Sequence, residues 1–308
     1  MKYRKNTMKQ LYACHTVYHL LITLLKHDAS DTKTDLYLFD AIPGVDHLAQ
    51  RIRETSLFDK VEVASESQRV FTELNTYRSI FIFNDWTYLG HFLRKHALAY
   101  RLLEDGYNYF AYTVYERGLS LKGKIFSYLF PASLPLGYSS WCRSIEVNDK
   151  SKVSSTDSRY SKMMEVPRKD LFARLSSDRK KQLLEIFGVQ PIATGSSQSV
   201  LILTQPLYQD KWDAQLVQTS QDQFAFYKQI VDQYADDYTV FMKVHPRDTV
   251  DYSSLQGVLF LDKHVPMELY EFVGEYFFDI GITHSSTALD FLSCVGEKIT
   301  IKEMREKQ

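Results

Sequence analysis

The chain has few cysteines and few glycines for its 308 residues. Its three cysteines, Cys14, Cys142 and Cys294, are odd in number and far apart, so neither a disulfide framework nor a paired zinc site is expected. The 12 glycines form no G-x-G-x-x-G stretch after a predicted strand, which argues against a dinucleotide-binding enzyme. The G-x-S-x-G elbow of many hydrolases is also missing. Three separated thiols are typical of a reduced, cytoplasmic protein.

An excess of charge of either sign is missing too. The 37 Lys and Arg residues balance 38 Asp and Glu residues, which argues against a nucleic-acid-binding protein. No run approaches the roughly 20 apolar residues of a membrane span, so we expect any membrane contact to be peripheral. The basic start, Met1–Lys5, is not followed by a small-residue cleavage site, and we interpret it as leading into a core strand rather than as a secretory signal.

The length and apolar content indicate two compact domains. In the first half, short apolar runs alternate with helical stretches, a pattern typical of a parallel α/β sheet. The predicted strands are Gln10–Cys14, Thr34–Phe39, Lys60–Val63, Ser79–Phe83 and Tyr109–Tyr115. The predicted helices are Thr16–His27, Val45–Ser56 and Tyr88–Leu103, the last ending at Glu104-Asp105-Gly106.

The second half repeats this alternation after a polar, Ser-rich stretch at 141–169. Its predicted elements are helix Ser177–Phe187, strand Val200–Pro206, helix Asp222–Tyr234, strands Tyr238–Val244, Val258–Leu261 and Tyr276–Thr283, and helices after Pro266 and from Ala288. We therefore predict an N-terminal, acceptor-side Rossmann-like domain at 1–150, a linker with a connecting helix at 151–192, and a C-terminal nucleotide-sugar-binding Rossmann-like domain at 193–308.

The first of two motifs in the second half is Lys243-Val244-His245-Pro246-Arg247-Asp248. Pro246 ends strand pairing because it lacks an N–H, and it leaves His245 at the C-terminal end of the strand. In open α/β sheets, ligands bind at that edge. A lone His-Pro is more often only a turn, so this motif needs support from a second one.

The second motif, Thr283-His284-Ser285-Ser286-Thr287-Ala288, lies between a predicted strand and a predicted helix. Hydroxyl side chains at such a junction cap the helix and leave backbone N–H groups for an anion, although most such runs are only N-caps. The two motifs in this order favour a nucleotide-phosphate site. Two sheet domains with ligand residues at strand ends match the GT-B type of glycosyltransferase.

Four segments in this order resemble glycosyltransferase family 52, which contains bacterial lipooligosaccharide and capsule sialyltransferases. They are Leu11–Ile22, Leu203–Leu207, Lys243–Asp248 and His284–Ala288. The similarity covers nearly the whole chain and thins between Trp141 and Gln198. It implies an α/β fold of GT-B type, with two Rossmann-like domains whose parallel sheets face a central cleft. It also implies CMP-sialic acid as donor and inverting transfer without a metal or a cofactor.

The resemblance also assigns residues to the donor. His245 would bind the donor phosphate and protonate it as it leaves, and Ser285 and Ser286 would hold the phosphate of CMP. Glu268, in a Pro-x-Glu stretch, would approach the ribose or base, or would simply be a first-turn helix acid. The expected donor-binding residues are His245, Pro246, Glu268, His284, Ser285, Ser286 and Thr287.

The catalytic base has two candidates. Similar sialyltransferases carry two acids followed by glycine, and one of the acids deprotonates the acceptor. The sequence Glu104-Asp105-Gly106 matches this pattern, but it is predicted at a helix end. The sequence Glu116-Arg117-Gly118 follows a predicted strand that ends at Tyr115, but it has Arg in place of the second acid. Because a base must face the acceptor, placement favours Glu116 over Asp105. Because Arg117 stands where similar sialyltransferases carry the second acid, the sequence leaves open whether the chain transfers sialic acid.

For other polar and aromatic residues near predicted strand ends, a functional and a structural interpretation are both open. His15 and His19 either face the acceptor or pack the first helix, and Trp86 either stacks on a sugar or packs the domain face. Arg247 and Asp210 either serve the donor or are ordinary surface charges.

The leading hypothesis is an inverting sialyltransferase that acts on a terminal sugar of a bacterial capsule or lipooligosaccharide from the cytoplasmic side. A UDP-sugar-dependent hexosyltransferase of the same family and a catalytically silent GT-B subunit of a polysaccharide assembly system are the alternatives. The expected partners are a nucleotide-sugar donor and an oligosaccharide or lipid-linked glycan acceptor, without nucleic acid. The inner face of the plasma membrane and a homodimer are compatible with the resemblance.

Overall fold

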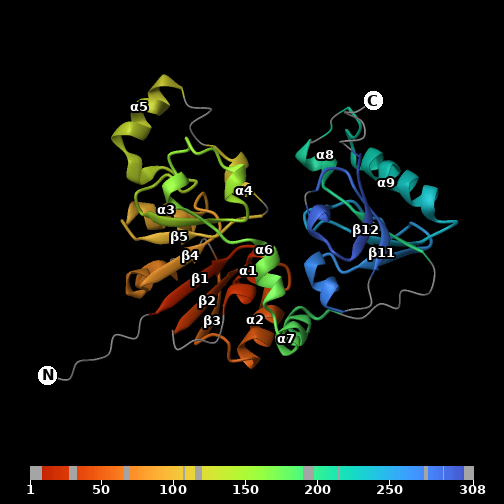
Figure 1. The fold of residues 1–308 in the computed structure, drawn as a ribbon, viewed down its shortest axis with the longest axis horizontal. Helices are drawn as coiled ribbons and strands as arrows, with labels where there is room; N and C mark the ends of the chain where they lie inside the picture. Colours follow the sequence, from red (N-terminus) through yellow and green to blue (C-terminus); the bar gives the residue numbers. More distant parts are fainter. Residues whose placement is uncertain are drawn as a thin grey trace. The chain divides into compact units, whose positions relative to one another are not determined.

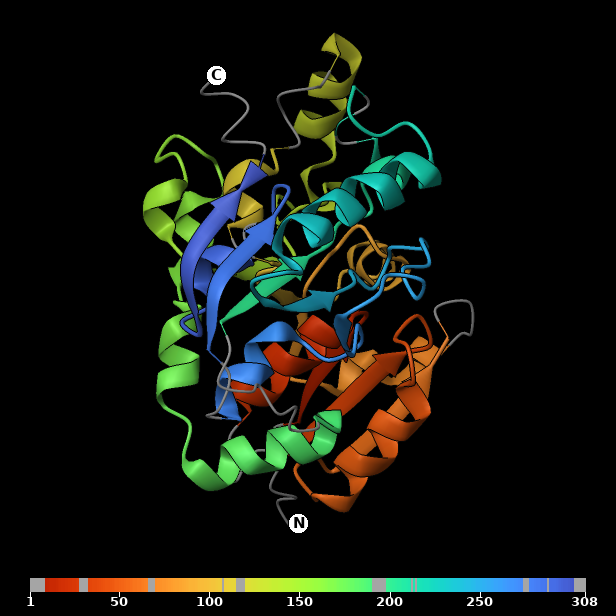
Figure 2. The same cartoon turned by 90° about the vertical axis from the view of Figure 1, so that its right-hand side faces the viewer.

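A computed structural model describes residues 9–27, 33–65, 70–106, 108–114, 120–189, 198–211, 213, 215–273, 277–286 and 288–301. The chain divides into two compact units, residues 1–186 and 187–308. Each unit contains its own sheet, in which all paired strands run parallel, with helices packed around it (Figures 1 and 2). The predicted α/β class with two parallel sheets is confirmed.

The sheet of the first unit has the order β3-β2-β1-β4-β5-β6-β7. Its strands are β1 (Gln10–Cys14), β2 (Thr34–Phe39), β3 (Lys60–Ala64), β4 (Ser79–Ile82), β5 (Tyr100–Leu102), β6 (Cys142–Val147) and β7 (Met163–Glu165). The chain leaves β1 toward one edge and then returns to place β4 on the other side of β1. The topological switch point, where ligands bind in such sheets, therefore lies between β1 and β4.

Helices cover this sheet and fix the ends of its strands. They are α1 (Val17–Lys26), α2 (Val45–Glu54), α3 (Tyr88–Lys95), α4 (Tyr109–Tyr112), α5 (Leu121–Leu129), α6 (Arg168–Ala173) and α7 (Ser177–Phe187), with 3₁₀ turns η1 (Val70–Thr76), η3 (Pro131–Ser133), η4 (Lys150–Lys152) and η5 (Tyr160–Lys162). Thr16 caps α1 by accepting the N–H of His19, so the helix starts almost directly after β1. Leu20, Leu21 and Leu24 of α1 are fully buried.

The sheet of the second unit has the order β10-β9-β8-β11-β12. Its elements are β8 (Ser199–Leu203), α8 (Leu207–Asp210), α9 (Ser220–Tyr234), β9 (Thr239–Lys243), β10 (Val258–Leu261), η6 (Met267–Phe272), β11 (Phe278–Thr283), η7 (Leu289–Phe291) and β12 (Val295–Thr300). Ile202, Met242 and Tyr227 belong to its buried core. The switch point here lies between β8 and β11.

Residues 88–115 differ most from the prediction. The helix expected to reach Leu103 ends at Lys95, and the strand expected over Tyr109–Tyr115 is the short helix α4. Asn108, in the left-handed conformation with φ 56°, turns the chain into α4, and the burial of Phe110 in the core of the first unit overrides the β-propensity of the aromatic residues. Glu104-Asp105-Gly106 consequently follows strand β5, not a helix.

The first unit extends beyond the predicted boundary at residue 150. The stretch expected to be a linker contains β7, which pairs with β6 in the first sheet, and also α6. Polar composition hides both elements, because β7 has only three residues and α6 only six. The helix expected at Ser177–Phe187 is confirmed.

The helix expected from Ala288 is wrong. Only the three-residue turn η7 follows the hydroxyl motif, and β12 then joins the edge of the sheet. A Cβ atom on Gly281 of β11 would lie 2.6 Å from both Leu289 and Val295 side chains. The glycine thus allows η7 and β12 to pack directly onto β11, and this close packing ends the turn early.

Candidate functional site

The three motif loops of the second unit follow neighbouring strands. Strands β9, β8 and β11 are adjacent and parallel, so their carboxyl ends lie along one edge of the sheet. His245 follows β9, Gln205 follows β8 and Ser285 follows β11. The structure therefore brings the His-Pro and Ser-Ser motifs to the same edge, next to the switch point.

Two backbone contacts fix His245 and its tautomer. The N–H of His245 donates to Oγ1 of Thr204 at 3.0 Å, and the N–H of Arg247 donates to Nδ1 of His245 at 3.1 Å. Since Nδ1 accepts a hydrogen bond, the ring hydrogen is on Nε2. Burial, with a smaller effect from Arg247, lowers the pKa of His245 to about 4. At neutral pH this side chain is therefore a neutral N–H donor.

Asp248 holds the His-Pro loop in place through hydrogen bonds of its backbone and its carboxylate. Its backbone N–H donates to the carbonyl of His245 at 2.8 Å, and its Oδ2 accepts the hydroxyl of Thr204 and the amide of Gln223, each at 2.9 Å. The hydroxyl of Tyr252 also donates to Oδ2, at 3.1 Å. Asp248 is almost fully buried, and burial raises its pKa. Sequence reasoning missed this network, because nothing in the spelling of the motif shows that Asp248 points inward.

The hydroxyl motif is organised by side chains, not by a helix end. Oε1 of Gln205 accepts both the N–H and the Oγ hydrogen of Ser285, at 2.8 and 3.1 Å. The N–H groups of Ser286 and Ala288 donate to the hydroxyls of Thr283 and Ser286, at 3.4 and 3.2 Å. The helix expected at this junction is replaced by the three-residue turn η7, and phosphate binding by this loop stays a prediction.

The neighbours of Ser285 and Ser286 have different environments. His284 is fully buried, with Nδ1 3.0 Å from Oγ of Ser285 and Nε2 3.4 Å from Asp213. It is positioned to orient Ser285 rather than to contact a ligand itself. Thr287, the last hydroxyl expected in the motif, lies outside the described residues.

The remaining donor-side residues lie around the loops after β9 and β10. Glu268 is partly buried in the first turn of η6. Burial raises its pKa, and the charge of Lys243 offsets only part of this effect. Lys243 donates to the carbonyl of Asp262 at 2.9 Å, and burial lowers its pKa to about 8. Pro246 is exposed beside His245.

Arg247 and Asp210 form one surface ion pair. The guanidinium contacts both carboxylate oxygens, at 3.0 and 2.8 Å, and the Arg247 side chain is 63% exposed. Each residue thus has its charge partner in the other, which fits the surface interpretation better than a direct role at the donor.

The first unit has a second polar cluster, built around Asp105. Its Oδ1 lies 2.6 Å from Nε2 of His19, and its Oδ2 accepts the side-chain amide of Asn84 at 3.2 Å. Nδ1 of His19 accepts the N–H of His15 at 3.2 Å, so Nε2 carries the hydrogen and donates to Asp105. The ring of His19 stacks on Phe83 at 4.1 Å. His19 and Asn84 follow β1 and β4, on either side of the switch point.

These contacts keep the Asp105 carboxylate ionised. Burial works to raise its pKa, but the hydrogen bonds from His19 and Asn84 hold the pKa below its ordinary value. The Asp105 side chain is still 26% exposed. A fixed, ionised and accessible carboxylate can accept a proton from a bound hydroxyl.

Glu104 has the opposite environment. It is almost fully buried and accepts the N–H of Asn148 in a short contact, while its carbonyl accepts Nη2 of Arg168 at 2.7 Å. Burial raises the pKa of Glu104 to about 7. Of the two acids, Glu104 ties β5 to the end of β6, and Asp105 faces outward. The other candidate, Glu116, lies with Arg117 outside the described residues.

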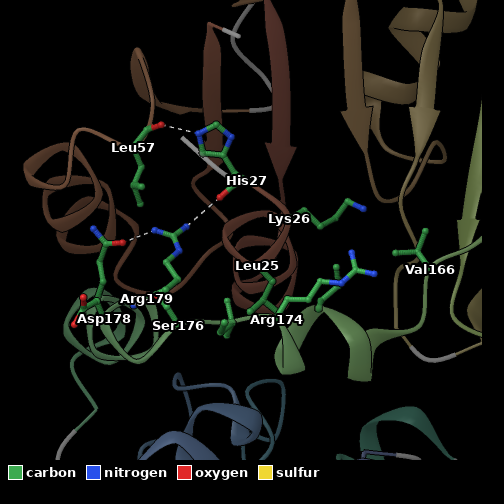
Figure 3. A pocket seen from close by; sticks show the side chains of 12 residues that line it. Leu25, Lys26, His27, Leu57, Val166, Arg174, Ser176, Asp178 and Arg179 are labelled. Carbon is green, nitrogen blue, oxygen red and sulfur yellow. Dashed lines mark hydrogen bonds between the residues drawn. The ribbon is translucent and has the colours of Figure 1, made fainter. Parts of the chain in front are cut away.

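A pocket of about 800 Å³ in the first unit contains none of these residues. It is lined by the end of α1, by Leu57 before β3, and by α6 and α7 (Figure 3). Arg179 donates to the carbonyl of Leu24 at 2.7 Å, and Lys26 pairs with Glu146 at 2.6 Å. In the part of the chain that the structure describes, no three His, Cys, Asp or Glu side chains gather as metal ligands.

Comparison with known proteins agrees with this architecture. The model of glycosyltransferase family 52 matches residues 45–305, and no curated protein matches the chain. Among solved structures, the wall teichoic acid polymerase TagF, as its H444N variant, is similar with a TM-score of 0.50 and 11% identity. The match covers 92% of this chain and 67% of that one. At this identity the likeness concerns the fold alone, and it supports the predicted GT-B type.

Proposed function

The chain belongs to glycosyltransferase family 52, and we propose that it transfers sialic acid from CMP-sialic acid to a terminal sugar of a bacterial capsule or lipooligosaccharide. The observation that carries this proposal is the position of Glu104-Asp105-Gly106 directly after β5. The two-acids-and-glycine pattern of similar sialyltransferases thus occurs in this chain at a strand end. In this proposal Arg117 no longer argues against sialyl transfer, because Asp105 and not Glu116 serves as the base.

On the acceptor side, Asp105 acts as the general base. The acceptor hydroxyl oxygen attacks the anomeric carbon of sialic acid while its proton moves to the Asp105 carboxylate. His19 and Asn84 each occupy one carboxylate oxygen, and they fix the orientation in which the proton is accepted. Attack from the side opposite the phosphate inverts the anomeric centre.

On the donor side, the bond between the anomeric carbon and the phosphate oxygen breaks, and its electron pair leaves with CMP. Nε2–H of His245 and the hydroxyl of Ser286 donate hydrogen bonds to the phosphate as negative charge develops, and Ser285 joins them by turning its hydroxyl hydrogen from Gln205 to the phosphate. Because the pKa of His245 is low in the free protein, its first contribution is a hydrogen bond. An adjacent phosphate raises that pKa and allows proton transfer to the departing oxygen. No metal is required in this scheme.

Turnover of CMP-sialic acid in the presence of EDTA tests the proposal. We expect CMP release that depends on one acceptor from a panel of capsule and lipooligosaccharide oligosaccharides, and sialic acid appearing on that acceptor by mass spectrometry. Transfer of a hexose from a UDP-sugar instead would replace the proposal with the hexosyltransferase. Absence of transfer from either donor class, in protein that still binds nucleotide, would indicate a silent subunit.

A further inference from the structure

The side chain of Tyr109 lies beside Asp105, and the proposed mechanism gives it no part. Tyr109 is the first residue of α4 and is only partly buried, as is Asp105. Its hydroxyl oxygen lies 3.4 Å from Nδ2 of Asn84, the same nitrogen that donates to Oδ2 of Asp105 at 3.2 Å. The phenol and the carboxylate therefore meet at one amide group, where both can reach a single ligand.

The direction of the Asn84 amide decides how the Tyr109 hydroxyl is oriented. Oδ1 of Asn84 accepts the backbone N–H of Trp86 at 2.8 Å, so Nδ2 is the atom that faces Asp105 and Tyr109. An amide nitrogen only donates, and the tyrosine oxygen is therefore the acceptor in this contact. The hydrogen of the Tyr109 hydroxyl consequently points away from Asn84.

Tyr109 is a neutral donor at neutral pH. Burial and the charges of Asp105 and Asp85 raise the pKa of its phenol, and the hydrogen bonds of Asn84 and Thr113 to the phenol offset only part of this effect. Within the part of the chain that the structure describes, no carboxylate or carbonyl oxygen accepts the hydroxyl hydrogen. A hydroxyl with a hydrogen to donate thus lies beside a carboxylate that can accept one.

A pair of this kind suits a ligand with two neighbouring hydroxyl groups. One hydroxyl donates to the carboxylate, and the oxygen of the other accepts from the phenol. Sugars carry such pairs, because the carbon next to a reacting hydroxyl usually bears another hydroxyl. A sugar that lacks the second hydroxyl would leave the Tyr109 hydrogen without a partner, which lowers affinity.

We propose that Tyr109 is an acceptor-specificity residue that recognises the hydroxyl next to the one that reacts. This inference rests on the proposed function, in which Asp105 takes the proton of the acceptor hydroxyl. The Tyr109 hydroxyl donates to the oxygen on the adjacent carbon of the same sugar. The acceptor is accordingly a sugar with a vicinal pair of hydroxyl groups, and transfer goes to one member of that pair.

Glycan binding measures this contact without any turnover. The full chain, with CMP present, is applied to an array of capsule and lipooligosaccharide oligosaccharides and of analogues in which single hydroxyls of the terminal sugar are replaced by hydrogen. We expect the wild type to bind one oligosaccharide, and the loss of one neighbouring hydroxyl to weaken binding about three- to tenfold. Tyr109→Phe should weaken binding of the parent by a similar factor, and it should bind the deoxy analogue as well as the wild type does.

Tyr112→Phe is the matched control. Tyr112 lies on the same helix and is 73% exposed, so this variant should bind every glycan like the wild type. A merely structural role of Tyr109 would disturb Asn84 and Asp105, and binding of the parent and of the deoxy analogue would then fall alike.

Three results would overturn the proposal: a wild-type chain that binds no glycan, a Tyr109→Phe variant that binds the parent as well as the wild type, and an equal loss for both glycans. Circular dichroism checks that Tyr109→Phe is folded. If it is not, the wild type decides, and equal binding of the parent and all deoxy analogues counts against the contact.

These outcomes are separate from those for sialyl transfer. A chain that shows the Tyr109 pattern of glycan binding but transfers nothing from CMP-sialic acid loses the proposed function and keeps the recognition of a vicinal pair. A chain that transfers sialic acid and binds its acceptor equally well as Tyr109→Phe loses only this inference.

Discussion

Two neighbouring acids, Glu104 and Asp105, have pKa values moved in opposite directions. Burial raises the pKa of Glu104, whereas hydrogen bonds from His19 and Asn84 outweigh burial at Asp105 and lower its pKa. Acids whose environments separate their pKa values in this way usually have separate roles. At this strand end, the proposed function assigns proton acceptance to Asp105 and a structural role to Glu104.

Replacing Asp105 with Asn should remove the base and keep one of its two side-chain hydrogen bonds, because the amide of Asn has a single acceptor oxygen. We expect kcat to fall by about 10²- to 10⁴-fold, with CMP binding unchanged, because CMP contacts are assigned to the second unit. Steady-state kinetics and a thermal shift with CMP measure the two quantities. Glu116→Gln is the matched variant and should retain activity; if it abolishes turnover while Asp105→Asn does not, Glu116 is the base.

Glu104 should make the stability of the protein depend on pH. Its folded pKa, about 7, is above the ordinary value, so its contribution is full below the ordinary pKa and is lost as pH rises through the folded pKa. The expected loss between about pH 4 and pH 8 is ~3 kcal/mol. Urea unfolding of the wild type and of Glu104→Gln across this range measures it, because other titrating groups cancel in the difference. A difference that stays constant with pH would contradict this assignment.

At the scale of elements, the loops after β8 and β9 are bound into one unit. Thr204 accepts the N–H of His245 and donates to the buried carboxylate of Asp248. The position of the His245 ring therefore depends on a strand that does not carry it. Gln205, the next residue, orients Ser285 after β11. The β8 loop thus connects both donor motifs.

Thr204→Val, which is nearly isosteric, should loosen this connection. It leaves the buried carboxylate of Asp248 and the N–H of His245 each short of a partner, so the free energy of unfolding should fall by about 1–3 kcal/mol. The KM for the donor should rise about tenfold, with the KM for the acceptor unchanged. The control is Thr300→Val, at a partly exposed threonine of the edge strand β12. An unchanged donor KM would show that the loop needs no such support.

The elements that sequence reasoning located well are those with enough residues to carry a pattern. Strands at Gln10–Cys14, Thr34–Phe39 and Val258–Leu261 have the predicted bounds. The three-residue strand β5 is too short for a periodic signal, and missing it put Asp105 on a supposed helix end. The charges of Glu297 and Lys298 hid the edge strand β12 in the same way.

The candidate site was predictable only in part. The spelling of the His-Pro and Ser-Ser motifs identified His245 and Ser285 at strand ends. The contacts among Thr204, Asp248 and Gln223 depend on side-chain direction after a turn, which spelling does not encode. The partnership of His19 with Asp105 joins residues 86 positions apart, and only the order of the strands brings them together.

At the scale of the whole molecule, both units place their polar clusters beside a switch point. In the first unit the cluster is Asp105 with His19 and Asn84, and in the second it is His245 with the Ser285 loop. The first contains a carboxylate that can accept a proton, and the second contains a neutral imidazole N–H that can donate to an anion. Transfer from a nucleotide-sugar needs both abilities, and the proposed function assigns one of them to each unit.

The most direct measurement is the thermal unfolding midpoint with CMP, CDP, UMP and UDP in turn, with EDTA present. A ligand at about 100 times its dissociation constant stabilises the folded protein by roughly 2.7 kcal/mol, which gives a clear shift. We predict a shift with CMP that UMP and UDP do not match, and its loss in His245→Ala. A shift with UDP alone, or with none of the four nucleotides, would contradict the account.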